Sequence, residues 1–442
     1  MNYYYNNKII YLIKKLKIEK IIGKFIKIEK CGVNYRGFSP FNKENNPSFI
    51  VSPKKKIWKD FSSGKGGNII TFFIEYMKFN YYESINFLVN NFFKKKIFFF
   101  EDINKNNLIK IQEYAKNIYI NNLNNNKYIQ KILFKLGFNN YIINKFSIGY
   151  SNIYNQLSNI IIKKKFKNKK LIIESGLFII KNNKLYDRFR NRIMFPIKNI
   201  YNNTIGFGGK IIQKNSKFSK YINSPNNNIY NKSKILYGLF EAKKYIIKYN
   251  LCYIVEGYTD TISLFNKGLK NVVSTTGINI NDYQIKIIKK YTSNIILLYD
   301  GDKAGIKASL KSIKIFLKNN INIKFFLFKK NYDPNKFLIK KKIIDIKKYF
   351  LKRSLNIIDF KLKIYKKKKN LDNPHHKYNF IKNLLIDINY LSNDLIKQIY
   401  LQVINKKFNL NINSIVKYNN YNNYNNYNNY NNYNNYNNYN NY

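Results

Sequence analysis

The 442-residue sequence predicts an α+β protein of several domains, because three different patterns follow one another along the chain. Residues 251–330 contain continuous apolar runs separated by amphipathic stretches, which is typical of buried parallel strands that alternate with helices. The residues before them mix short strands and helices, whereas residues 345–416 have the apolar spacing of helices alone. A chain of this length can form roughly two to four domains with separate cores.

The first hundred residues are expected to form a small mixed unit. The segment "FIVSPKKKIWKDF" predicts a hairpin, since two short apolar stretches flank a Pro-Lys turn, and "NIITFFIEYMKFNYYESINFLVNNFF" has helical spacing. Residues 110–165 predict helices, with two short ones around the glycine of "YIQKILFKLGFNNYIINKF". The segment "RIMFPIKNIYNNTIGFGGKII" predicts two strands joined by an Asn-rich turn, and its glycines suit close packing in a sheet.

The charge of the chain points to a polyanionic partner. The sequence has 80 Lys and Arg against 23 Asp and Glu, a formal charge of +57, with 41 Tyr and 34 Phe in the same segments. Basic residues interleaved with aromatic ones suit single-stranded nucleic acid, whose phosphates meet Lys and whose bases stack on rings. Drift toward codons rich in A and T accounts for part of the same composition. The few acidic residues are therefore more informative than the many basic ones.

Cysteines and histidines are too few and too scattered for a disulfide framework or a Cys/His metal site. The two cysteines, Cys31 and Cys252, lie far apart, which fits a reducing cytoplasm, and Cys31 is expected to be a buried thiol. The only histidines are the adjacent His375 and His376. No apolar run is long enough to span a membrane, and the first residues do not have the pattern of a signal peptide.

Acidic residues follow two of the predicted parallel strands. Glu256 comes directly after the run that ends at Val255, and Asp300 and Asp302 follow "NIILLY". Carboxyl ends of neighbouring parallel strands line one crevice, so we expect these carboxylates to meet there, with Asp333 of "NYDPN" beside them. Hard oxygen ligands of this kind suit Mg²⁺. The alternative is that these residues only cap helices and form turns.

The same residues carry a resemblance to a known family. "EGYTD" at 256–260 and "DGDKAG" at 300–305 resemble the two signatures of a Toprim domain, which primases, topoisomerases and some nucleases and recombination proteins share. The segments "LYDRFRNRIMFPIKNIYNNTIGFGGKII", "KYINSPNNNIYNKSKILYGLFEAK" and "KFSIGYSN" are similar to the catalytic core of DnaG-type primases. The resemblance extends from about residue 15 to 416.

The resemblance implies a division of the chain into five parts. These are a zinc-ribbon-like DNA-binding domain at 1–100, a basic N-terminal subdomain of the primase core at 110–240, a Toprim catalytic domain at 241–345, a helical subdomain at 346–416 and a disordered Tyr-Asn repeat tail at 417–442.

The resemblance also implies roles for individual residues. Glu256, Asp300 and Asp302 correspond to the catalytic, metal-binding acids, with Asp260 and Asp333 as further ligands of Mg²⁺ or Mn²⁺. Template and nucleotide phosphates are expected to meet a groove lined by Arg188, Arg190, Arg192, Lys210, Lys220, Asn223, Ser224 and Lys232. In "DPN" the family usually has a second Asp. Asn335 can offer a carbonyl oxygen there but no charge, so one of the implied metal positions lacks its charged ligand.

The N-terminal domain departs from the family at its zinc site. Members of the family bind zinc through "CPFH" and "CFGC" turns, but here the four ligand positions hold Ser39, Asn42, Asp60 and Ser63. Neutral hydroxyl and amide groups do not replace thiolate and imidazole on zinc, so we expect zinc to be absent. Packing by aromatic residues is expected to replace the metal, namely by Phe41, Phe49, Trp58 and Phe61. A phosphate cradle at "SGKGGN" is the less favoured alternative, because the loop lacks P-loop spacing.

The function that follows from this resemblance is that of a DNA primase, a DNA-directed RNA polymerase that makes short RNA primers for replication. Its expected partners are a single-stranded DNA template, nucleoside triphosphates and the RNA primer, with no membrane. A replicative helicase is a further candidate, although no separate docking domain is evident. The expected location is the cytoplasm, at the nucleoid and replication fork. Two alternatives stay open: another Toprim enzyme, such as a topoisomerase or nuclease, and a decayed primase that only binds single strands.

Overall fold

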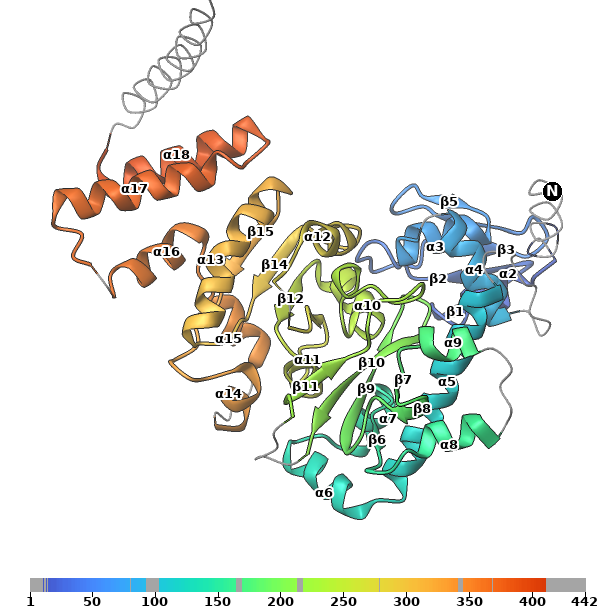
Figure 1. Cartoon of the computed structure of the whole chain (residues 1–442). Helices are drawn as coiled ribbons and strands as arrows, with labels where there is room; N and C mark the ends of the chain where they lie inside the picture. The colour runs from blue at the N-terminus through green and yellow to red at the C-terminus, as the bar shows by residue number, and fades with distance from the viewer. Residues whose placement is uncertain are drawn as a thin grey trace, which may run out of the picture.

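The computed structural model describes residues 11, 13, 15–79, 81–92, 103–163, 169–212, 218–277, 279–340, 345–367 and 369–410. The N-terminal domain lies at one end of the molecule and the last helices lie at the other, with a mixed sheet unit and a parallel sheet unit between them (Figure 1). The Tyr-Asn tail predicted at 417–442 lies outside the described residues.

The N-terminal domain is built on an antiparallel sheet whose strands follow sequence order. The strands are β1 (Ile28–Cys31), β2 (Asn34–Gly37), β3 (Phe49–Ser52), β4 (Ile57–Asp60) and β5 (Gly66–Gly67). The helices are α2 (Ile18–Ile22), α3 (Ile69–Met77) and α4 (Tyr81–Phe92). The predicted hairpin is therefore present as β3 and β4, with Phe49 opposite Asp60.

Aromatic rings fill the core of this domain, as the sequence predicts for three of four positions. Phe49 and Trp58 are fully buried and stacked, with ring centroids 5.5 Å apart, and Phe41 lies 5.6 Å from Trp58. Phe61 is 64% exposed, so its predicted packing role is wrong. Side chains alternate along β4, and since Trp58 and Asp60 face inward, the next residue faces outward. Cys31 is also exposed, contrary to expectation, because β1 presents most of its residues to solvent.

A hydrogen-bonded carboxylate lies at one of the four positions that the resemblance assigns to zinc ligands. The Asp60 side chain is fully buried, and its Oδ2 accepts hydrogen bonds from the Ser39 hydroxyl (2.9 Å), the Ser62 hydroxyl (3.1 Å) and the backbone N–H of Ser63 (3.0 Å). The Ser63 hydroxyl also donates to Oδ2, and the Ser48 hydroxyl lies 3.3 Å from Oδ1. Burial alone would raise the pKa of Asp60, but the serine hydrogen bonds outweigh it and leave the pKa below its ordinary value.

The two turns that correspond to the family's zinc-ligand turns are also joined to each other. The Ser39 hydroxyl accepts from the backbone N–H groups of Phe41 and Asn42, both at 3.1 Å. The Asn42 side-chain amide donates to the carbonyl of Ser62 at 3.0 Å. All four ligand positions therefore take part in one polar network centred on Asp60, which the sequence analysis did not foresee.

The mixed unit combines one long helix and several short ones with a second antiparallel sheet. Its helices are α5 (Ile103–Asn124), α6 (Lys127–Lys135), α7 (Asn140–Lys145), α8 (Gln156–Lys163) and α9 (Lys169–Glu174). Its sheet has the order β11-β10-β9-β6 and is formed by β6 (Gly149–Ser151), β9 (Arg192–Lys198), β10 (Thr204–Ile211) and β11 (Tyr221–Asn223). A separate hairpin consists of β7 (Phe178–Lys181) and β8 (Lys184–Asp187). The predicted strand–turn–strand and helix–glycine–helix segments are both present.

The four apolar runs form the parallel sheet that the sequence predicts. It has the order β13-β12-β14-β15, with β12 (Cys252–Val255), β13 (Val272–Ser274), β14 (Asn294–Leu297) and β15 (Asn322–Phe325). The helices that alternate with these strands are α10 (Leu239–Tyr249), α11 (Tyr258–Asn266), α12 (Asp282–Lys289) and α13 (Lys303–Lys318), with the short helix η1 (Lys232–Lys234) before them.

Helices alone complete the described chain. They are α14 (Pro334–Lys340), α15 (Ile346–Arg353), α16 (Ile357–Tyr365), α17 (Pro374–Ile388) and α18 (Asp394–Phe408). Helices α17 and α18 lie side by side next to α13, and their buried residues extend the core of the parallel sheet unit (Figure 1). In the described part of the chain, no helix combines the length and the apolar composition needed to cross a bilayer.

We expect Asp60→Asn to destabilise the N-terminal domain by about 2–4 kcal/mol, because charge-assisted hydrogen bonds are worth about 1.5–3 kcal/mol each and a neutral amide accepts them less well. The pKa of Asp60 is lowered in the folded state. The stabilisation that its carboxylate provides is therefore complete above the unfolded-state pKa and is lost as the pH falls from there through the folded-state pKa. The acid-dependent loss of stability should therefore be smaller in the variant.

Trp58 reports this transition, since it is the only tryptophan of the chain and is buried in this domain. Urea unfolding is followed by its fluorescence between pH 3 and 7. Glu29→Gln is the matched control, because the Glu29 side chain in the same domain is 75% exposed. Equal midpoints for Asp60→Asn and Glu29→Gln would show that the network contributes nothing.

Candidate active site

Two neighbouring parallel strands deliver the first acids to one place. Strands β12 and β14 pair directly, with Ile254 opposite Leu297, so the residues that follow them lie at the same edge of the sheet. There the Oε1 atom of Glu256 accepts a hydrogen bond from the backbone N–H of Asp300 at 3.2 Å. The predicted meeting of these two acids at the strand ends is thus what the fold produces.

Asp302 is the N-cap residue of helix α13. Its Oδ1 accepts a hydrogen bond from the backbone N–H of Gly305 at 2.7 Å, so the residue caps the helix. Helix capping was the alternative to metal binding that the sequence left open for these acids. The two roles do not exclude one another, because a carboxylate has further lone pairs. Gly305 is required at its position, since a Cβ there would lie 2.3 Å from the Asp300 carbonyl and 2.9 Å from Glu256 Oε1. The start of α13 can therefore approach the acids closely.

Burial and mutual repulsion raise the pKa values of three carboxyl groups in this cluster. Burial, followed by the charge of Asp333, raises the pKa of Asp260 to about 7. Burial and the neighbouring carboxylates, Glu256 first, raise the pKa of Asp300 to about 8, and burial also raises that of Glu256. One oxygen of Asp300 is buried and has no hydrogen-bond partner in the described structure. The negative charges of the ionised cluster are not balanced by its neighbours, and a bound cation would balance them.

The acids fit one side of a metal site and do not enclose it. Among the described residues, no three Asp, Glu, His or Cys side chains converge closely enough to hold a metal ion by themselves. Mg²⁺ usually keeps several waters and binds through one or two carboxylates together with substrate phosphates. The unpartnered oxygen of Asp300 and the adjacent Glu256 match that requirement.

Two lysines and one tyrosine of the mixed unit, on or beside its antiparallel sheet, lie opposite the acids. Lys210 of β10 has a pKa lowered by burial and by Lys220, while the charges of Asp260 and Asp333 favour its protonated form. The ammonium groups of Lys210 and Lys220 each lie 5.8 Å from the ring centre of Tyr221. Sequence reasoning did not single out Tyr221, although burial and the nearby acids raise its pKa to about 12.

The predicted groove residues separate into two groups. Arg192 is buried, and its guanidinium donates to the carbonyls of Gly209 (3.2 Å), Ser219 (3.0 Å) and Lys220 (3.4 Å), so it ties the residues just before β11 to β10. Ser224 is also buried, and its hydroxyl accepts from the backbone N–H of Phe207 at 2.9 Å. These two residues support the groove from within.

The other predicted residues lie nearer to solvent. With the Asn223 amide oriented to satisfy its neighbours, its nitrogen donates to the Tyr258 hydroxyl at 2.8 Å and its oxygen accepts from Lys232 at 3.1 Å. Burial lowers the pKa of Lys232 and of Arg188, and Arg188 has a buried Nε atom without a partner in the described structure. Arg190 is exposed.

The Asn335 side chain is hydrogen-bonded to a neighbouring helix. Its side-chain oxygen accepts from the Ser263 hydroxyl at 2.9 Å, and its backbone N–H lies 3.4 Å from Asp260 Oδ1. The residue therefore joins α14 to α11.

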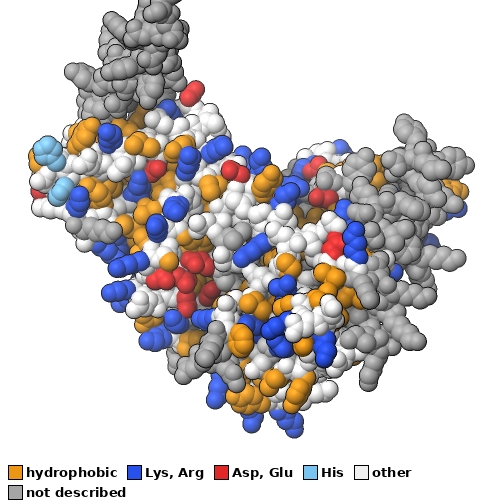
Figure 2. Space-filling model, viewed as in Figure 1, with side chains coloured by type: hydrophobic (Ala, Val, Ile, Leu, Met, Phe, Trp, Pro, Cys, Tyr) orange, Lys and Arg blue, Asp and Glu red, His pale blue; other side chains and the backbone are white. Residues whose placement is uncertain are grey.

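Acidic and basic side chains are also separated on the surface. A compact group of acidic side chains lies on the face shown in Figure 2, with Lys and Arg side chains distributed around it.

Three family profiles match successive parts of the sequence. Residues 4–98 match a CHC2 zinc finger, residues 114–243 match the N-terminal domain of the DNA primase catalytic core, and residues 253–338 match a Toprim-like domain. The first match identifies the N-terminal domain as a member of the zinc-ribbon type by sequence, although its four ligand positions carry other residues.

Curated relatives and solved structures agree with these profiles. The DNA primase of Halalkalibacterium halodurans is 30% identical over 413 residues, which cover 91% of this chain and 68% of the relative. That of Clostridium acetobutylicum is 34% identical over 334 residues, which cover 73% and 55% of the two chains. The zinc-binding and RNA polymerase domains of Aquifex aeolicus primase superpose with a TM-score of 0.62 at 27% identity, covering 91% of this chain and 97% of that one.

A second structure, a DnaG primase catalytic domain bound to single-stranded DNA, superposes with a TM-score of 0.61 at 25% identity and covers 70% of this chain and 97% of that one.

We expect Asp300→Asn to stabilise the protein at alkaline pH in the absence of divalent cations. A carboxylate with a raised folded-state pKa costs stability as the pH rises from its unfolded pKa to about 8, and the amide does not ionise. The thermal midpoint of the variant should exceed that of the wild type at pH 9 and approach it at pH 5, with about 2–4 °C for each kcal/mol relieved. Asp394→Asn, at an exposed residue, is the control. A wild-type midpoint that is unaffected between pH 5 and 9 would contradict the electrostatic account.

Proposed function

The chain belongs to the DNA primase family of the DnaG type, and from this premise we propose that it synthesises short RNA primers on single-stranded DNA. The main observation in support is a partly buried, mutually repelling acid cluster at the ends of β12 and β14, which faces Lys210 of β10 and Lys220, the residue before β11. Acids in that position are suited to cation binding, and the facing lysines are suited to phosphates.

In the proposed reaction, the 3′-hydroxyl of the primer or the first nucleotide attacks the α-phosphate of an incoming nucleoside triphosphate, and pyrophosphate leaves. Mg²⁺ or Mn²⁺, held by Glu256 and Asp300 with Asp260, Asp302 and Asp333 nearby, would neutralise the charge that develops on the phosphate. Asp302 and Gly305 set the position of the first turn of α13 beside these acids.

The facing sheet would orient the other substrates. Lys210 and Lys220 flank the ring of Tyr221 opposite the acids, so phosphates can be bound there while a base stacks close by. Arg192 and Ser224 would act indirectly, by holding the residues just before and just after β11 in place. Lys232, Arg188 and Arg190 remain candidates for contacts with the template.

The proposed partners are a single-stranded DNA template, ribonucleoside triphosphates and the growing RNA primer, and the proposed place of action is the replication fork in the cytoplasm. A replicative helicase would be a further partner. The matched relatives are named primases, which favours this activity over that of another Toprim enzyme. The remaining alternative is a decayed primase that only binds single strands, and a measurement of primer synthesis distinguishes it from an active enzyme.

We expect Asp300→Asn and Glu256→Gln each to reduce primer synthesis on the order of a thousandfold, because each removes charge stabilisation at the reacting phosphate. Binding of single-stranded DNA should stay within about twofold of wild type, since phosphate contacts dominate that affinity. The assay follows labelled nucleotides on a single-stranded template, with Asp394→Asn as the control. Substantial synthesis by either variant in Mg²⁺ would overturn the assignment of the acids.

We also propose that the N-terminal domain folds without zinc, because the Asp60 network occupies all four ligand positions. Elemental analysis of purified protein should find far less than one zinc per chain, and a strong chelator should leave the unfolding midpoint reported by Trp58 unchanged. One tightly held zinc per chain would show that the oxygen ligands bind the metal after all.

A further inference from the structure

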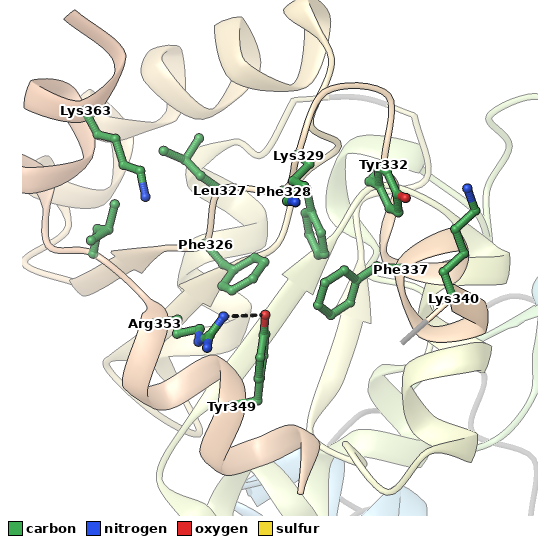
Figure 3. A pocket seen from close by; sticks show the side chains of 11 residues that line it. Phe326, Leu327, Phe328, Lys329, Tyr332, Phe337, Lys340, Tyr349, Arg353 and Lys363 are labelled. Atoms are coloured by element: carbon green, nitrogen blue, oxygen red, sulfur yellow. Dashed lines mark hydrogen bonds between the residues drawn. The ribbon is translucent and has the colours of Figure 1, made fainter. Parts of the chain in front are cut away.

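A cavity lies beside the acid cluster, at the outer edge of the parallel sheet. It has a volume of about 620 Å³ and opens between the segment that follows β15 and helices α14, α15 and α16. Figure 3 shows aromatic rings in its interior and basic side chains around its margin. That size is typical of a pocket for a small ligand or a single unit of a larger one.

The charge of this cavity is not balanced. Four cations line it, Lys329, Lys340, Arg353 and Lys363, and all four are exposed. No Asp or Glu is among the lining residues, and none of the four cations forms an ion pair within the described part of the chain. Two other cavities differ, because in each of them a lining carboxylate pairs with a lining lysine, Glu83 with Lys290 and Asp387 with Lys361.

The arginine is the most informative of these residues. Lysine is common throughout the sequence, but arginine occurs at only five positions, and three of those are in "DRFRNR". Arg353 is held in place by Tyr349: its guanidinium lies 4.4 Å from the ring centre and donates to the hydroxyl at 2.8 Å (Figure 3). On the opposite margin, the ammonium of Lys340 lies 5.3 Å from the ring of Tyr332. The cavity therefore combines positioned cations with half-buried rings.

The segment that forms one wall also touches the acid cluster. The backbone N–H of Gly301, between Asp300 and Asp302, donates to the carbonyl of Tyr332 at 2.8 Å. A Cβ at Gly301 would lie 2.2 Å from the carbonyl of Lys329, so the two turns are in direct contact. The segment then continues into Asp333. A polymeric ligand that extends beyond the acid cluster in this direction would therefore contact this wall of the cavity.

We propose that this cavity binds one nucleotide unit of a single-stranded nucleic acid that extends from the acid cluster. The phosphates contact Arg353, Lys363, Lys329 and Lys340, and a base stacks on the rings of Tyr332 and Tyr349. The combination of unbalanced cations with aromatic faces is what single-stranded nucleic acid requires, and stacking makes the contact tolerant of sequence. This site lies outside the proposed catalytic groove, and its occupation does not require that the chain synthesise primers.

The test measures binding of a fluorescein-labelled 20-nucleotide oligo-dT to the full chain, without nucleotides or divalent cations. The variant is Arg353→Glu with Lys363→Glu. Its matched control is Lys352→Glu with Lys366→Glu, since these exposed lysines lie on or at the end of the same two helices, do not line the cavity and give the same change of charge. We expect the cavity variant to bind on the order of tenfold more weakly than the control at 0.1 M salt. The slope of log K against log salt should be smaller by about 0.7 for each phosphate that the variant no longer binds.

Photo-crosslinking locates the strand independently. An oligonucleotide that carries 5-iodouracil should form adducts at Tyr332 or Tyr349, and these adducts should be absent from the cavity variant but present in the control. Equal affinities of the two double variants, or adducts only elsewhere, would overturn the proposal. A free mononucleotide that binds the wild type but not the cavity variant, with strand affinity unchanged, would also overturn it in favour of a small ligand. Repeating the binding in Asp300→Asn separates this site from catalysis.

Discussion

The repulsion among carboxylates at the ends of β12 and β14 is the constraint on which the rest of the catalytic face depends. Glu256 and Asp300 are joined through a backbone hydrogen bond and share a partly buried position, where their charges cannot all be present without a cation. Gly305 lets the first turn of α13 come close, and Lys210 and Tyr221 face the cluster from another sheet. Each of these features brings polar or positive groups near the acids without neutralising them.

A second buried carboxylate shows how different the same group is when it serves structure. Asp60 accepts hydrogen bonds from several serine hydroxyls and a backbone N–H, and its pKa is lowered. Asp300 has one unpartnered oxygen, and its pKa is raised. The number of donors around the carboxylate makes the difference: a saturated carboxylate stabilises the fold, whereas an unsaturated one is available to bind a ligand.

The lysines of this chain likewise serve different purposes at different places in the fold. Most of the lysines that the structure describes lie on the surface, but Lys243 is buried where the N-terminal domain meets the rest of the chain. It donates to the carbonyl of Ile200 at 2.8 Å, lies 4.8 Å from the ring of Phe79, and burial lowers its pKa to about 8. Only position in the fold separates such a residue from the solvated majority.

By itself the sequence determined the order of elements and the acids, because both depend on local patterns. Continuous apolar runs predict the buried strands β12 to β15, and carboxylates directly after β12 and β14 must lie at one edge of a parallel sheet. The replacement of the four zinc-ligand residues was equally visible. What the sequence could not show is which polar groups meet across long separations. The serines around Asp60, the carbonyls around Arg192, the exposure of Phe61 and the contact between Gly301 and Tyr332 were decided by tertiary packing alone, since in each case the partner or the face depends on how distant segments are placed.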